Sequence, residues 1–227
     1  MQHQTTQALV EYWNAIRGDR PAPRRSEIEP RDIKRLLPYV FILERQDHWS
    51  FRFRLAGTGL CNAYGTEFRR QNMLGLWQDE CHTNMTHLLN DVTGSAAAGV
   101  LEYTAETGEG RQVSFEMVLL PLAQDNGALT RIIGAAVPLE NPAWLGDQML
   151  TRQWIDRIQL IDPDQMPKSA AAALAPRIAR QAPPRIHAGI PSLAARRQRL
   201  SGERPYLRLI KSEVPNTGTA TGKVFES

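Results

Sequence analysis

Cysteine is scarce in this sequence, and the scarcity excludes several kinds of site. The 227 residues include only Cys61 and Cys81, with no CxxC pair and no cluster of cysteine with histidine. A disulfide framework or a structural zinc site needs more of these residues at closer spacing. We therefore expect both cysteines to be reduced thiols that serve as small core residues.

Long apolar runs are missing as well. No segment approaches the roughly 18 apolar residues that a membrane-spanning helix needs. The opening MQHQTTQALVEYW lacks the basic-then-apolar order of a signal peptide. These features predict a cytoplasmic protein with no membrane span. GxSxG, HExxH and P-loop motifs are absent too, and we predict that the protein is not an enzyme.

Charge is distributed unevenly along the chain. Residues 1–162 hold 16 Lys/Arg and 20 Asp/Glu, whereas residues 163–227 hold 11 and 4, so the net charges are −4 and +7. The mildly acidic first part argues against a nucleic-acid-binding core. The Ala-, Pro- and Arg-rich segment 163–227 predicts a basic, largely disordered tail.

Apolar spacing predicts several helices. The first runs from Thr6 to Arg17, with Gly18 as its stop. A second, short helix is expected between Pro30 and Pro38. A third apolar stripe from Trp77 to Val92 predicts the longest helix of the domain.

Five strands are expected as well. YVFILE (39–44) and SFRFRLA (50–56) predict the first two strands, and SFRFRLA alternates apolar with charged side chains. Three more are expected at 100–104, 111–122 and 129–137, separated by the turns TGEG and QDNG. This order predicts an α+β fold: a five-stranded antiparallel sheet with helices on one face, preceded by two N-terminal helices.

The expected boundaries divide the chain into four parts. Residues 1–38 form an N-terminal helical cap, residues 39–140 the core, and residues 141–162 a flanking segment. The flanking segment has a helical or mixed pattern, and the tail 163–227 follows it.

The order of elements is similar to that of the PAS fold, and the sequence resembles a bacterial PAS variant over about residues 8–138. The resemblance lies in the joint order of short motifs. They are Leu9, Tyr12-Trp13, Arg17-Gly18, PAPRRS (21–26), Pro30, Asp32-Ile33, Leu37-Pro38, FRFRLAGT (51–58), Tyr64-Gly65, Glu116, LLPL (119–122) and Gly134.

This resemblance implies a sensory or protein-interaction module in signal transduction. It also implies a signalling partner, homodimerisation and a possible small-molecule ligand. Side chains between sheet and helices are the candidates for an apolar ligand pocket, although the same periodicity suits a filled core. The candidates are Phe53, Leu55, Tyr64, Trp77, Met85, Leu89, Phe115 and Met117. Candidates for a partner contact or a core cap lie on the first helix: Leu9, Tyr12, Trp13 and Ile16.

Two alternative functions are considered. The first is a haem- or cofactor-binding sensor. Some PAS domains bind haem through a histidine, and His82 and His87 lie on the expected long helix. Five residues turn an α-helix by about 500°, so these two side chains point apart and are read as ordinary histidines. No cofactor is required, and the surroundings of Cys61 do not resemble a flavin-adduct motif. The second alternative is a transcriptional regulator that binds nucleic acid through the basic tail, for which aromatic stacking residues are few.

Overall fold

The computed structural model describes residues 1–165. Except for its first three residues, the tail expected at 163–227 lies outside the described residues, and so does the nucleic-acid interface proposed for it. The helices are α1 (Gln4–Arg17), α2 (Thr58–Tyr64) and α3 (Asp79–Ser95), with short 3-10 turns η1 (Arg25–Glu27), η2 (Met73–Leu76) and η3 (Pro163–Gln165). The strands are β1 (Val40–Asp47), β2 (Ser50–Ala56), β3 (Ala98–Thr107), β4 (Gln112–Leu122), β5 (Arg131–Pro138) and β6 (Leu150–Ile161).

The six strands form one antiparallel sheet in the order β2-β1-β5-β4-β3-β6. The α+β class and the five expected antiparallel strands are confirmed. The structure adds β6, which pairs along β3 from Ala98 opposite Ile161 to Thr107 opposite Leu150.

The helical or mixed pattern expected within residues 141–162 is corrected by β6. The spacing of Leu150, Trp154 and Ile158 fits a helix as well as a strand, and the sequence alone left the segment helical or mixed. The neighbouring β3 decides the matter, because its outer row of backbone N–H and C=O groups needs hydrogen-bonding partners. The segment satisfies that row as an extended strand.

The first N-terminal helix is present, but the second is not. α1 begins after His3, whose Nδ1 accepts a hydrogen bond from the Thr5 N–H at 3.1 Å, and it ends at Gly18 with φ at +59°. Residues 30–39 form successive turns, with isolated bonds such as Leu36 N–H to Ile33 O at 2.8 Å. Pro38 disfavours the helical conformation for Leu37 before it, and the hydrogen bonds of this stretch remain those of separate turns.

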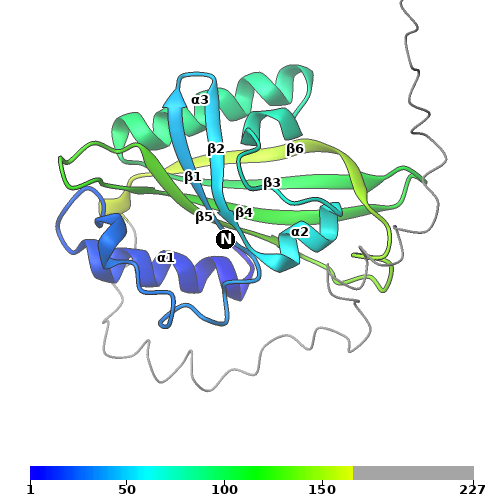
Figure 1. Ribbon diagram of the computed structural model, residues 1–227, viewed down its shortest axis with the longest axis horizontal. Coiled ribbons are helices and arrows are strands. Elements are labelled where there is room, and N and C mark those ends of the chain that lie inside the picture. The colour runs from blue at the N-terminus through cyan, green and yellow to red at the C-terminus, as the bar shows by residue number, and fades with distance from the viewer. Residues whose placement is uncertain (166–227) are drawn as a thin grey trace, which may run out of the picture. The chain divides into compact units, whose positions relative to one another are not determined.

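Helices cover both faces of the sheet. The helices α2 and α3 pack on one face, and α1 packs on the other, against β4 and β5 (Figure 1). Alternation along β4 serves both layers: Val118 and Leu120 join the cluster beneath α1, whereas Leu119 borders Gly99, which Leu88 and Val92 of α3 contact. The strands of the sheet thus lie between the two helix layers.

No helix among residues 1–165 is both long and apolar enough to cross a bilayer.

Candidate ligand pocket and N-terminal cap

A cavity of about 90 Å³ lies at one end of the sheet. Its walls come from the start of α2, the first part of β4, the end of β5, the turn before β1, and the loop that joins β5 to β6. The lining residues are Pro38, Tyr39, Thr58, Gly59, Leu60, Asn62, Ala63, Phe115, Ala136, Pro138, Asn141, Leu145 and Gly146.

The lining of this pocket is apolar with a few neutral polar groups. None of its residues carries a formal charge, and the polar side chains belong to Tyr39, Thr58, Asn62 and Asn141. The phenol of Tyr39 is neutral at pH 7, and burial raises its pKa further above 10.0. The pocket therefore suits a neutral molecule.

Two glycines let the first turn of α2 sit against the turn before β1. The Gly59 and Leu60 N–H groups donate to the Pro38 carbonyl oxygen at 2.8 and 3.2 Å. A Cβ on Gly57 would lie 2.2 Å from the Leu37 oxygen, and one on Gly59 would lie 2.9 Å from the Pro38 oxygen. Side chains at these positions would separate the two walls, so the glycines of GTG (57–59) shape the pocket.

Of the eight side chains expected to line a pocket, only Phe115 lines this one. The prediction that Leu55 lines a pocket is wrong, because this residue is 44% exposed. A β-bulge is the reason, because Leu55 pairs with Ile42 while Phe53 pairs with Leu43, so one residue of β2 is extra. The bulge turns the Leu55 side chain away from the face of the sheet on which Phe53 is buried. The others pack in the interior: Phe53, Trp77, Met85, Leu89 and Met117 are buried, and Tyr64 is partly buried.

Aromatic rings fill much of the interior between the sheet and the helices. Phe53 stacks on Phe68 with ring centroids 5.0 Å apart. Beside the pocket, Phe115 stacks on Tyr103 at 5.0 Å, and Trp77 meets Tyr103 edge-on at 5.4 Å. Such pairs stabilise a core beyond their buried area. The pocket thus lies next to a filled aromatic core rather than inside it.

Tyr64 joins this aromatic interior to β6. Its hydroxyl donates to Gln153 Oε1 of β6 and lies 3.4 Å from the Tyr103 hydroxyl. Burial raises the pKa of Tyr64 and of Tyr103 above 10.0. The sequence analysis missed Tyr103 and Gln153, because a polar residue on a strand gives no sign that its hydroxyl or amide points inward.

The four candidate contact residues of α1 face the sheet. Leu9 and Trp13 are fully buried, Tyr12 is 7% exposed, and Ile16 packs on the same cluster. Trp13 Nε1 donates to the Pro121 carbonyl oxygen at 2.8 Å, and the Tyr12 hydroxyl accepts from the Glu29 N–H at 2.8 Å. These side chains cap the core, which is one of the two roles considered for them from the sequence.

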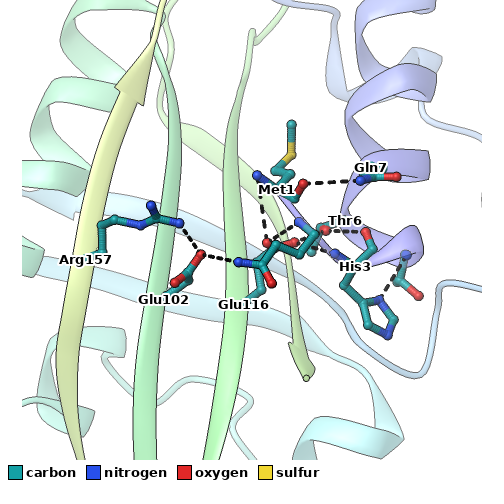
Figure 2. A network of polar contacts seen from close by, with 9 residues as sticks. Met1, His3, Thr6, Gln7, Glu102, Glu116 and Arg157 are labelled. Atoms are coloured by element: carbon teal, nitrogen blue, oxygen red, sulfur yellow. Dashed lines mark hydrogen bonds and ion pairs between the residues drawn. The ribbon is translucent and has the colours of Figure 1, made fainter. Parts of the chain in front are cut away.

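A buried carboxylate anchors the N-terminal end of this cap. Glu116 of β4 is fully buried and accepts hydrogen bonds from the Gln2 N–H at 2.6 Å, the His3 N–H at 3.2 Å and the Thr6 hydroxyl. Figure 2 shows the segment Met1–Gln7 gathered over the two neighbouring glutamates of the sheet. Burial lowers the pKa of His3, and the nearby Glu116 charge partly opposes that shift.

The network continues across the sheet to β6. Glu102, opposite Glu116 on β3, accepts from the Gln2 side chain at 3.3 Å and pairs with Arg157 (Figure 2). The sequence had marked Glu116 only as part of a motif. A usable signal was present, because Glu116 shares its face of β4 with the apolar Val118 and Leu120, and a charge on a buried face requires partners.

The histidine and cysteine candidates are not brought together. On α3, His82 is partly exposed and His87 is exposed, and no three metal-binding side chains cluster among the described residues. Cys61 is buried, Cys81 is partly buried, and both are free thiols. Burial raises the pKa of Cys61 above 9.0.

The sheet order and the helices on both faces define a small α+β domain with a partly open pocket at one end of its sheet. A family model described as "PAS domain" matches residues 1–137. The chain belongs to the PAS domain family, whose members are sensory modules of signal transduction. β6 and the loop before it lie beyond the matched residues.

Solved structures with a similar trace include PAS and light-oxygen-voltage (LOV) domains. A LOV domain from a flavin-analogue study is 10% identical, covers 49% of this chain and 84% of its own, and has a TM-score of 0.40. A PAS domain from Colwellia psychrerythraea is 13% identical (44% and 85%, TM-score 0.36), and a LOV protein from Rhodobacter sphaeroides is 9% identical (51% and 71%, TM-score 0.38). No curated protein matches the chain.

Proposed function

We propose that this chain is a non-catalytic, cytoplasmic sensory module. In this proposal a small molecule occupies its pocket and changes how its N-terminal cap associates with a second copy or a signalling partner. No bound cofactor is required. Its two free thiols fit a reducing compartment.

The observation that carries the proposal is the position of two consecutive residues of β4. Phe115 lines the pocket on one face of the sheet, and Glu116 holds the N-terminal segment on the other. Successive side chains of a strand point to opposite faces, so one short piece of backbone serves both sites. A ligand that shifts Phe115 therefore moves the anchor of the cap.

A ligand has this effect only if it binds two arrangements of the cap with different affinity. The cap suits such a role, because a compact set of hydrogen bonds to one carboxylate holds its first residues. Loosening these bonds would expose part of the apolar surface between α1 and the sheet, to which Leu9 and Trp13 of α1 contribute. An exposed patch of this kind is a typical binding surface for a partner.

Native mass spectrometry of the gently purified protein tests the sensory role. We expect a retained small molecule, a homodimer, or both. Hydrogen exchange then tests the coupling: Phe115→Leu should speed amide exchange in residues 2–8. Phe53→Leu is the matched control, because Phe53 is equally buried on the same face but contacts Phe41 and Phe68 instead. A bare monomer at every concentration, with equal exchange in both variants, would refute the proposal.

A further inference from the structure

We propose that the pocket beside α2 binds a neutral, mostly apolar molecule about the size of a single six-membered ring, held in place by the loop between β5 and β6. This inference rests on the proposed sensory function and names the ligand class and the site.

The volume of the cavity sets the size of the ligand. At about 90 Å³ it is smaller than the ~150 Å³ apolar cavity that holds benzene in another protein. A ring of about six non-hydrogen atoms is therefore at the upper limit of size, and the walls must move outward to admit it. Larger molecules fit only if part of them projects through the mouth.

The lining sets the polarity of the ligand. Leu60, Ala63, Phe115 and Leu145 supply apolar surface. Because the described lining offers no cation or anion, a charged ligand would lose its hydration without gaining an ionic partner. The neutral side chains of Tyr39 and Thr58 lie in the lining and suit one or two hydrogen bonds to a hydroxyl or carbonyl group.

The closing wall comes from outside the residues that match the family. Asn141, Leu145 and Gly146 belong to the β5–β6 loop, which follows residue 137. This loop also reaches α2, since a Cβ on Gly65 would lie 2.7 Å from Met149. A ligand in the pocket therefore touches both α2 and the loop that leads into β6, and it stabilises their contact.

Calorimetric titration with three small probes tests this site. Phenol and indole represent neutral rings of two sizes, and benzoate represents a charged ring. We expect saturable binding of phenol, and binding of benzoate at least tenfold weaker. Benzoate binding as tight as phenol would overturn the chemistry assigned to the lining.

Two substitutions act on the pocket in opposite directions. Ala63→Leu fills it and should weaken phenol binding at least tenfold, whereas Leu145→Ala enlarges it and should tighten indole binding at least fivefold. Leu129→Ala is the matched control, because Leu129 is also a partly buried leucine of a loop but packs beneath α1. It should leave both affinities within twofold.

The inference is overturned if phenol and indole both fail to bind saturably, in the wild-type protein as well as in Leu145→Ala. It is also overturned if binding ignores both pocket substitutions. Either failure leaves the sensory proposal open to its own test, because native mass spectrometry and hydrogen exchange use no probe. Conversely, phenol binding in a protein whose cap does not respond to Phe115→Leu would keep the site and remove the proposed coupling.

Discussion

Arg17 of α1 donates a hydrogen bond of 2.6 Å from Nη2 to the carbonyl oxygen of Pro163, immediately beyond β6. Its guanidinium is 1% exposed and also bonds Asn14 Oδ1 at 2.7 Å, the Arg20 oxygen at 2.8 Å and Asp164 Oδ1 at 3.1 Å. It lies over the Trp13 ring, 5.5 Å from the centroid. A buried cation of this kind is tolerated because every side of it has an acceptor or an aromatic face. The N-terminal cap and the end of the last strand are thus joined by one side chain.

Replacing Arg17 should destabilise the protein and free the segment after β6. Arg17→Met keeps much of the apolar stem but removes all the hydrogen bonds, so we expect the free energy of unfolding to fall by about 2–4 kcal/mol. Urea unfolding measures this loss, and hydrogen exchange should rise in residues 162–165. In the control Asp164→Asn the loss should stay below about 1 kcal/mol, because Asp164 is 80% exposed. Equal losses in the two variants would show that Arg17 is not the joint between these segments.

Thr6 and Glu116 should be energetically coupled. Glu116→Gln leaves a neutral amide where a carboxylate accepts several hydrogen bonds, and we expect a loss of about 1–3 kcal/mol. A double-mutant cycle with Thr6→Val should give a coupling of at least about 0.5 kcal/mol. Glu11→Gln, at an exposed position of α1, is the control and should change stability little. Strict additivity of Thr6→Val and Glu116→Gln would contradict the direct bond.

The buried tyrosines should make the protein sensitive to alkali. Burial raises the pKa of Tyr64 and Tyr103 above 10.0 in the folded state. Above pH 10 the unfolded chain loses these protons first, so stability should fall as the pH rises through and beyond that value. Ultraviolet absorbance reports tyrosinate and circular dichroism reports folding, and we expect these two phenols to ionise only as the fold is lost. Tyr64→Phe should make the fall less steep, whereas ionisation of all tyrosines near pH 10 in a folded protein would refute the burial argument.

The two cysteines should differ in reactivity. Burial raises the pKa of Cys61 and lowers its thiolate fraction, whereas Cys81 is partly exposed. We expect iodoacetamide to modify Cys81 at least tenfold faster than Cys61 in the native protein, as measured by peptide mass spectrometry. The rates should converge in urea, which serves as the control. Because Cys81 Sγ accepts the Ile155 N–H at 3.4 Å, its modification should also raise hydrogen exchange in β6.

Much of the fold follows from local patterns. Alternation identified β2, turn residues separated β3, β4 and β5, and apolar spacing found α1. Each of these signals depends on side chains within one segment, so the sequence carries it without help from distant contacts. The motif order then indicated the family, which the match over residues 1–137 confirms.

The two wrong predictions from the sequence, for the Leu55 side chain and for the segment that forms β6, share a physical cause. Leu55 continues the alternation of Phe51 and Phe53, but a bulge that depends on pairing with β1 turns it outward. The β6 segment suits either helix or strand, and the free edge of β3 selects the strand. In both places the backbone conformation is set by a partner strand.

The amino-acid order by itself determined the α+β class, the five central strands, the capping helix and the sensory family, because periodicity and turn chemistry are properties of short segments. Only the tertiary structure decided where the pocket lies, which face α1 covers, and that Glu116 and Arg17 bind the ends of the cap. Those features arise where segments far apart in sequence meet, and a buried charge or a cavity exists only once its walls have been assembled.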